Sequence, residues 1–450
     1  MSTRQQSPAV WSNQTVFILA AVGSAVGLGN LWKFPYITGE NGGGAFVLVY
    51  LGCVLLIGLP VLMAEISLGR RGAASPPEAM KKLAKENSAS KLWWLLGLNG
   101  VLAGVLILSF YTVIAGWAAA YFYDSFIGEL KNINAKQAGE HFDALIANPM
   151  HLLFWHTILM LATILVVSKG LKSGIEKAIS YMMPILLVLL LILLGYAMTT
   201  SGFGQSVSFL FNPDFSKLSW NSVLIAMGHA FFTLSIGLGT MMVYGSYLSK
   251  QNSIVKASIW IAFADTLVAL IAGMVIFSIV FANGLEAGSG PGLLFQTLPV
   301  AFGQMSGGWL FGTLFFGLVV IAAFSSAISL IEPAISWVID RWKMSRNNAS
   351  WLIGLMTWLV GIGSVLSFND WSSQHILNDK NFFETLDYIT TNIMLPLGGL
   401  FMAIFFGWIL TKEQVKEELE LNNKTLTIFL NILKYITPIA VSIVFVSNFL

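Results

Sequence analysis

Long apolar runs separated by short polar segments follow one another along the whole chain. A helix needs roughly 20 apolar residues to cross the hydrocarbon core of a bilayer. Hydrophobic residues make up 56% of the 450 positions and charged residues only 10%, against about 25% charged in soluble domains. The pattern predicts an all-α polytopic membrane protein with a single transmembrane domain. Its eleven expected spans cover 14–37, 44–69, 92–123, 152–167, 174–199, 221–247, 256–282, 308–340, 350–369, 384–411 and 426–449.

The first apolar run is a poor helix in its middle. Gly23, Gly27 and Gly29 each cost about 1 kcal/mol relative to alanine, and a proline such as Pro35 costs roughly 3 kcal/mol inside a helix. Asn30 and nearby Lys33 stand at membrane depth, where polar groups are expensive and usually functional. Broken backbone is tolerated there only where it lines a cavity or contacts protein. This break is therefore predicted to form half of a binding site for an ion and a small solute.

The same kind of interruption recurs five spans later. Residues 26–30 read Val-Gly-Leu-Gly-Asn, and residues 236–240 read Ile-Gly-Leu-Gly-Thr. An odd number of spans per repeat inverts the second repeat in the membrane, and paired interrupted spans indicate the binding site of a transporter. We expect a 5+5 inverted repeat with broken helices 1 and 6, its halves at about 14–199 and 221–411. One extra C-terminal helix would cover about 426–449.

The distribution of basic residues predicts the orientation. With a cytoplasmic N-terminus, 18 of the 24 Lys and Arg residues fall on the inside, four lie in outside loops, and Lys33 and Lys434 lie within spans. Cytoplasmic loops carry the excess of Lys and Arg. We therefore expect a multi-pass protein of the cell inner (plasma) membrane with an extracytoplasmic C-terminus. The net charge of +2 gives no indication of nucleic-acid binding, because the charges fall in short loops.

The polar residues within spans suggest ion binding and not an enzyme. Asn30, Thr233 and Asp265 offer hard oxygens and one negative charge, which suits an alkali cation. Their spacing does not separate Na⁺ from a proton or a structural ion pair. Half-helices that end at mid-membrane add free N–H groups for a carboxylate and free carbonyls for a cation. A zwitterionic solute fits such a pair of breaks, and the sequence holds no nucleophile–base pair typical of an enzyme.

Further motifs occur in order along nearly the whole chain. Residues 23–30 read Gly-Ser-Ala-Val-Gly-Leu-Gly-Asn, and residues 40–46 read Glu-Asn-Gly-Gly-Gly-Ala-Phe. The others are Phe34-Pro35, Pro60, Glu65, Gly69-Arg70, Tyr111, Trp117, Asn212-Pro213-Asp214-Phe215, Phe231-Phe232-Thr233-Leu234-Ser235, Ser325-Ser326, Pro333 and Tyr435-Ile436-Thr437-Pro438. Together they resemble the neurotransmitter:sodium symporter family, and in particular its bacterial amino-acid branch with eleven spans.

The resemblance implies sodium-coupled symport of neutral, hydrophobic L-amino acids into the cell by alternating access, with a monomer sufficient for transport. It implies one sodium site at Ala25, Asn30, Thr233 and Asp265, and a second at Gly23, Val26, Ala322, Ser325 and Ser326. The implied substrate pocket consists of Ser24, Ala25, Leu28, Gly29, Ile107, Tyr111, Phe232, Thr233, Ser235, Leu238, Ser326 and Leu330.

It also implies gating residues, several of which depart from the family pattern. Lys33 replaces the usual arginine opposite Asp387 at the outer gate and lacks its bidentate fork. His229 replaces a glutamine, which either makes closure sensitive to pH or only replaces a donor. Asp340 matches the inner gate, but its arginine partner is displaced, so a role for Arg4 is open. Gly174 and Pro184 bracket the part of span 5 that can unwind.

One departure bears on chloride. Asp265 stands where the family has an asparagine, and Ala269 stands where chloride-dependent members have a serine. A fixed carboxylate could replace the chloride charge, so we expect transport without chloride. Two alternatives stay open: a symporter of the same fold for another small zwitterion or an amine, and a membrane protein that binds a solute without transporting it. An amine substrate usually requires an acid at the position of Ser24, where this chain has none.

Overall fold

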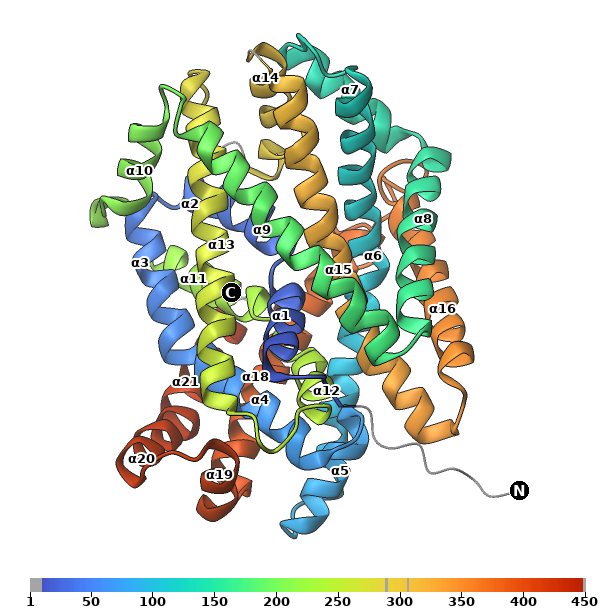
Figure 1. Ribbon diagram of the computed structural model, residues 1–450, viewed down its shortest axis with the longest axis vertical. Helices are drawn as coiled ribbons and strands as arrows, with labels where there is room; N and C mark the ends of the chain where they lie inside the picture. The colour runs from blue at the N-terminus through green and yellow to red at the C-terminus, as the bar shows by residue number, and fades with distance from the viewer. Residues whose placement is uncertain (1–9, 288–289, 306, 448–450) are drawn as a thin grey trace.

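The computed structural model describes residues 10–287, 290–305 and 307–447, and its regular structure is helical throughout apart from one isolated bridge between Leu377 and Lys380. Figure 1 shows the arrangement. The α-helices are α1 (Gln14–Ala25), α2 (Phe34–Glu40), α3 (Gly44–Cys53), α4 (Leu59–Gly72), α5 (Pro76–Glu86), α6 (Trp94–Ile127), α7 (Ala135–Ala147), α8 (Pro149–Ser168), α9 (Lys177–Ala197), α10 (Phe203–Phe211), α11 (Trp220–Thr233), α12 (Thr240–Ser246), α13 (Ile254–Ala282), α14 (Thr297–Gln304), α15 (Gly308–Trp342), α16 (Arg346–Leu366), α17 (Phe382–Asp387), α18 (Leu395–Ile404), α19 (Lys412–Leu419), α20 (Asn423–Asn431) and α21 (Thr437–Ser447).

Short π- and 3₁₀-helical segments connect or interrupt these helices. The π segments are η1 (Gly29–Lys33), η2 (Val54–Gly58), η4 (Leu171–Glu176), η7 (Tyr388–Met394), η8 (Phe405–Ile409) and η9 (Ile432–Ile436). The 3₁₀ segments are η3 (Lys91–Trp93), η5 (Phe215–Lys217) and η6 (Gly290–Leu293). Single π segments often mark functional sites in helices, and η1 lies at the predicted break.

The expected all-α membrane fold and both broken helices are confirmed. Among the described residues, nine helical stretches are long and apolar enough to cross a membrane, or ten if the bent pair from Gln14 to Glu40 counts as one. The predicted sixth span is split into α11, of 14 residues, and α12, of 7 residues, with non-helical backbone at 234–239. The count of eleven spans is not confirmed, because neither short half is long enough to cross by itself. The inverted repeat stays a prediction.

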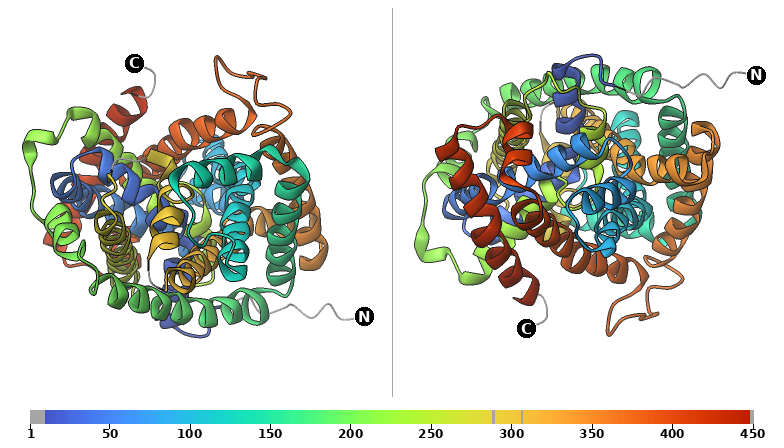
Figure 2. Two further views of the ribbon diagram at one scale, coloured as in Figure 1. Left: turned by 90° about the horizontal axis from the view of Figure 1, so that it is seen from above. Right: turned by 90° about the horizontal axis from the view of Figure 1, so that it is seen from below.

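The core of the molecule is a pair of long helices. α6 and α15 pack along each other, and the end-on views show the other long helices around them (Figure 2). Gly104 permits this approach, because a Cβ atom there would lie 2.8 Å from the Leu330 carbonyl oxygen. α1 packs against α13, α15 and α9, so both halves of the chain surround the first break.

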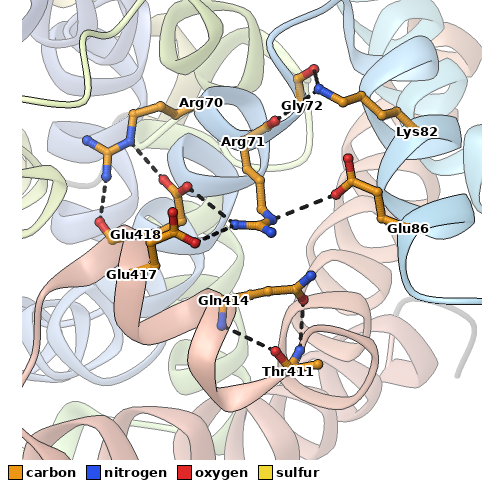
Figure 3. Close-up of polar contacts among 9 residues, drawn as sticks. All are labelled: Arg70, Arg71, Gly72, Lys82, Glu86, Thr411, Gln414, Glu417 and Glu418. Atoms are coloured by element: carbon orange, nitrogen blue, oxygen red, sulfur yellow. Dashed lines mark hydrogen bonds and ion pairs between the residues drawn. The ribbon is translucent and has the colours of Figure 1, made fainter.

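An ion-pair network fastens the end of α4 to the helix that follows the tenth predicted span (Figure 3). The Arg70 guanidinium donates to the Glu418 carboxylate at 2.8 Å, to the Glu418 carbonyl at 2.6 Å and to the Asn252 carbonyl at 2.7 Å. Arg71 adds bonds to Glu417 at 3.1 Å and an ion pair with Glu86 at 3.9 Å. The basic residues after span 2 therefore anchor α19 and α5 in addition to setting the charge balance.

Candidate functional site

The break in the first span follows from its glycines. α1 ends at Ala25, Val26 takes an extended conformation, and the helix axis turns by 51° before α2. A Cβ atom on Gly27 would lie 2.5 Å from the Ser326 hydroxyl and 2.8 Å from the Tyr111 hydroxyl, so no side chain fits there. The backbone therefore leaves the helix where two neighbouring helices bring hydroxyl groups within reach of it.

A buried carboxylate lies beside this break. The Asn30 side-chain amide donates to Asp265 Oδ1 at 2.8 Å and to the Asp265 carbonyl oxygen at 3.0 Å. The Thr233 hydroxyl lies 2.9 Å from Asp265 Oδ2, and Asn30 Oδ1 accepts the Gly27 N–H at 3.1 Å. Asn30 and Asp265 are 0% exposed and Thr233 is 1% exposed. Three residues predicted for the first cation site thus meet, and they form a buried cluster of hard oxygens that includes one carboxyl group.

A second cluster lies between α1 and α15. The Ser326 hydroxyl approaches the carbonyl oxygens of Gly23, Ser24 and Val26 at 3.5, 3.3 and 3.2 Å. Ser325 instead bonds the Ala322 carbonyl of its own helix at 2.9 Å, as serine in a membrane helix usually does. The free carbonyls at the end of α1 thus converge on one hydroxyl, in a setting able to coordinate a cation.

The two breaks enclose a small cavity of about 30 Å³. Its lining comprises eleven of the twelve residues predicted for the substrate pocket, with Gly27 in place of Thr233. The Tyr111 hydroxyl accepts the Leu28 N–H at 3.3 Å, and the Ser235 hydroxyl donates to the Ser24 carbonyl at 3.2 Å. One water needs about 10–15 Å³ of such volume, so the cavity in this conformation has room for a water or two and not for an amino acid.

The break in the sixth span is held by a buried acid. Glu65 on α4 is 0% exposed, and its Oε2 accepts the Gly237 N–H at 2.9 Å. Ser235, Gly237 and Gly239 all have positive φ, at 54°, 83° and 71°, so the segment is folded away from helical geometry. In the sequence, Glu65 is one of the motif residues of the family resemblance, with no role assigned to it. Its role as the partner of the second break becomes visible only in the packing of α4 against α12.

A second cavity, of about 100 Å³, lies next to the first and holds the predicted outer-gate residues. Leu28, Tyr111 and Phe232 line both cavities and separate them, and Lys33 and Asp387 line only the second. Lys33 Nζ lies 4.7 Å from the centre of the Phe232 ring, and Asp387 accepts the Thr391 hydroxyl at 3.0 Å. Among the described residues, no ion pair within 4.0 Å joins Lys33 and Asp387. The Lys33 ammonium group therefore lies over the Phe232 ring and not against Asp387.

His229 lies behind this gate in an aromatic environment. It is 2% exposed, and its ring lies 5.9 Å from Phe34 and 5.4 Å from Tyr50, measured between centroids. Within the described part of the chain, neither ring nitrogen has a hydrogen-bond partner. Its role in gating stays a prediction.

The acid predicted for the inner gate has a backbone partner in the structure, and its gating role stays a prediction. Asp340 accepts the Ser75 N–H at 2.7 Å at the start of α5, and Arg4 lies outside the described residues. Glu332, a buried acid on α15, accepts hydrogen bonds from both Arg346 Nη1 and the Tyr247 hydroxyl at 2.9 Å. The Trp11 indole donates to the Tyr244 carbonyl at 2.9 Å. The N-terminal segment, α12, α15 and α16 are thus joined beneath the cavity.

Span 5 is helical at both marked positions. Gly174 lies in η4, and Pro184 lies inside α9 without breaking it. A Cβ atom on Gly23 would lie 3.2 Å from the sulfur of Met183, the residue before Pro184. The predicted unwinding stays a prediction, and the Met183 side chain packs against Gly23 of α1.

The comparisons with known proteins agree with this geometry. The Sodium:neurotransmitter symporter family model matches residues 9–141 and 141–450. The chain is 37% identical to YhdH, an uncharacterised sodium-dependent transporter of Bacillus subtilis, over 98% of both chains. It is 32% identical to an uncharacterised sodium-dependent transporter of Haemophilus influenzae over the full length of both.

The crystal structure of MhsT in complex with L-phenylalanine is similar to this fold, with a TM-score of 0.90 and 42% sequence identity. The match covers 98% of this chain and all of that one. The chain therefore belongs to the sodium:neurotransmitter symporter family, a family of sodium-dependent membrane transporters and not of enzymes.

Proposed function

We propose that this chain imports neutral, hydrophobic L-amino acids together with sodium, by alternating access and without chloride. One observation carries the proposal: a buried carboxyl cluster, Asp265 with Asn30 and Thr233, lies next to a small cavity between two broken helices. MhsT, the structural relative, was crystallised with L-phenylalanine. An uncharged apolar side chain suits the cavity wall formed by Ile107, Leu238 and Leu330.

Two sodium ions are assigned to the two oxygen clusters. The first would take the Asp265 carboxylate, the Thr233 hydroxyl, Asn30 Oδ1 and the Ala25 carbonyl, together with the substrate carboxylate. The second would take the carbonyls of Gly23, Val26 and Ala322 with the hydroxyls of Ser325 and Ser326. Carboxylate, carbonyl and hydroxyl oxygens are suitable ligands for a hard cation, and the first cluster has a charge that water does not screen. The fixed charge of Asp265 also supports independence from chloride.

The order of events follows from the closed cavity. Leu28 and Phe232 must move apart to admit a substrate, and Lys33 must leave its place over the Phe232 ring. The Tyr111 hydroxyl and the N–H groups that follow the first break would then hold the carboxylate. Sodium stabilises the substrate-loaded state only if it binds that state more tightly than the substrate-free state. On the inner side, unwinding of span 5 would move Met183 away from Gly23 and admit water to the second sodium site.

The positive-inside distribution supports a cytoplasmic N-terminus and insertion in the cell inner membrane. All proposed ligands come from one chain, which supports transport by a monomer. A free-amine substrate is disfavoured, because Ser24 stands where an acid is usually required and none of the residues that line the cavity is an acid.

Uptake by purified protein in liposomes tests the proposal. An inward sodium gradient should drive accumulation of labelled L-phenylalanine, and neutral hydrophobic amino acids should compete with it whereas aspartate and lysine should not. If the protein binds the amino acid but shows neither accumulation nor counterflow in liposomes, a solute-binding protein that does not transport is favoured. Uptake of equal size in potassium would contradict sodium coupling.

A further inference from the structure

A groove away from the transport pathway lies between the start of α6 and α18. Its volume is about 500 Å³, within the range of about 300–1,000 Å³ typical of ligand sites. Six of its eight lining residues are apolar, and the two polar ones are Ser90, which precedes η3, and Asn99 in α6. This groove takes no part in the function proposed above.

The surroundings of the groove belong to the membrane. Leu92, Leu95 and Phe401 are 67%, 46% and 42% exposed in the isolated chain, and α6 and α18 both belong to helical stretches long enough to span. The Trp93 ring lines the groove, and its centroid lies 5.0 Å from that of the Phe405 ring. Tryptophan is enriched at the membrane–water interface. The occupant of the groove must therefore be apolar and must come from the bilayer.

Two basic residues belong to the segments beside the groove. Lys91 lies between the lining residues Ser90 and Leu92 in the sequence, and exposed Lys85 lies in the last turn of α5, which contacts η3 and α6. The nearby carboxylates are engaged elsewhere: Glu78 pairs with Lys81 and Glu86 with Arg71. Among the described residues, neither Lys85 nor Lys91 has a carboxylate within 4.0 Å. Basic groups near the surface attract anionic headgroups.

The inner end of the groove reaches the break in the sixth span. The Asn99 side-chain amide donates to the Met394 carbonyl at 2.9 Å, which joins α6 to the start of α18. A Cβ atom on Gly398 would lie 2.9 Å from the Gly237 carbonyl oxygen, so α18 contacts the break directly. A chain packed in the groove would support this seam from the lipid side.

We propose that the groove between α6 and α18 is a specific phospholipid site, which takes one acyl chain of an anionic lipid from the leaflet on the α5 side. Lys91, with Lys85, binds the phosphate-bearing headgroup, and the leucines with Trp93 and Phe401 hold the chain. Lipid bound there stabilises the contact between α18 and the span 6 break.

Native mass spectrometry of the delipidated, full-length protein in detergent tests this site, with phosphatidylglycerol and phosphatidylcholine of identical acyl chains as probes. We expect one phosphatidylglycerol to bind at least fivefold more tightly than phosphatidylcholine. Leu397→Trp, which fills the groove, should weaken that binding at least fivefold, and Lys91→Gln should abolish the preference for the anionic lipid. Leu359→Trp on the exposed face of α16 and Lys172→Gln at the start of span 5 are matched controls that should bind as the parent does.

A second measurement locates the chain even if Leu397→Trp fails to fold. Phosphatidylglycerol with brominated acyl chains quenches nearby tryptophans, and the difference between the parent and Trp93→Phe isolates Trp93. We expect saturable quenching of Trp93 at the same lipid concentration as in the mass spectra. Equal binding of the two lipids with no effect of Lys91→Gln, or no Trp93 component in the quenching, would show annular lipid only and overturn the proposal.

Discussion

At the scale of single residues, Asp265 is the group on which the account depends most. It is fully buried, and its carboxylate is held by Asn30 and Thr233. Asp265→Asn keeps the shape but removes the charge and replaces one of the two acceptor oxygens by an NH₂ donor. We expect the half-saturating sodium concentration for uptake to rise at least tenfold, about 1.4 kcal/mol. Asp370→Asn, an exposed acid outside the site, is the control, and unchanged sodium dependence of the Asp265 variant would refute its role.

Gly27 tests the close approach at the first break. A methyl group there would overlap the hydroxyls of Ser326 and Tyr111. Gly27→Ala should therefore abolish sodium-dependent amino-acid binding, measured by scintillation proximity. Gly52→Ala on α3, where no atom lies within 4 Å of the new methyl group, should bind as the parent does. Normal binding by Gly27→Ala would mean that the two hydroxyls move aside freely.

The residue scale also shows which contacts could be predicted from the sequence. Glycines and the buried polar residues marked both breaks, because such groups are rarely tolerated inside a membrane helix without a function. The pairing of Asn30, Thr233 and Asp265 followed from their chemistry and from the family resemblance. The bond from Glu65 to Gly237 and the contact of Lys33 with Phe232 did not, because each depends on side-chain placement between helices distant in the sequence.

At the scale of helices, the bounds of most spans were predicted to within a few residues, but their number was not confirmed. Apolar length alone does not reveal that α11 and α12 are separated by six non-helical residues. Nor does it reveal the partners of Glu332, since Arg346 and Tyr247 come from two other elements. The small volume of the central cavity, about 30 Å³, likewise depends on side-chain packing and does not follow from apolar length.

The α9 helix carries a prediction about sodium release. Pro184 lacks an N–H for the carbonyl four residues before it, and alanine would restore that bond and favour the helical form. Pro184→Ala should slow efflux of sodium and substrate from preloaded liposomes severalfold, with equilibrium binding unchanged. Ile185→Ala on the lipid-facing side of the same turn serves as the control, and equal efflux rates for the proline variant would count against unwinding.

The α7 helix carries a prediction about pH. His141 Nε2 lies 3.0 Å from the Asp124 carboxylate, which raises the pKa of this histidine above its ordinary value of 6.5. A raised pKa means that the bond stabilises the fold below pH 6.5 and that this stabilisation is lost as the pH rises through the raised value. His141→Gln should lower the midpoint of thermal unfolding at pH 6 and much less at pH 9.

The expected size is about 1 kcal/mol or less, because the pair is partly solvated. The exposed loop residue His375 provides the comparison, and His375→Gln should show no such pH dependence. Equal destabilisation of His141→Gln at both pH values would indicate lost packing against Tyr121 and not a charge interaction.

At the scale of the whole molecule, two broken helices from distant parts of the chain share one closed site. Each break is held from a different side: Ser326 and Asp265 hold the first, and Glu65 and α18 hold the second. On the side of the second cavity, the Phe232 ring and the Lys33 ammonium group cover the site. Such an arrangement suits a solute that reaches the site alternately from either side, with sodium as the ion that stabilises the loaded state.

Chloride provides a whole-molecule test of the charge balance. With the Asp265 carboxylate built into the site, uptake in sodium chloride and in sodium gluconate should be equal within error. Choline chloride should support none. A severalfold loss in gluconate would show that an external anion supplies the charge and that Asp265 does not replace it.

The most direct test of the central claim is accumulation of L-phenylalanine by purified protein in liposomes under an inward sodium gradient. We expect the amino acid to become more concentrated inside than outside, this accumulation to disappear when the gradient is dissipated, and Asp265→Asn to lose it at the same sodium concentration. Accumulation that is independent of sodium, or unaffected by removal of the Asp265 charge, would contradict the claim.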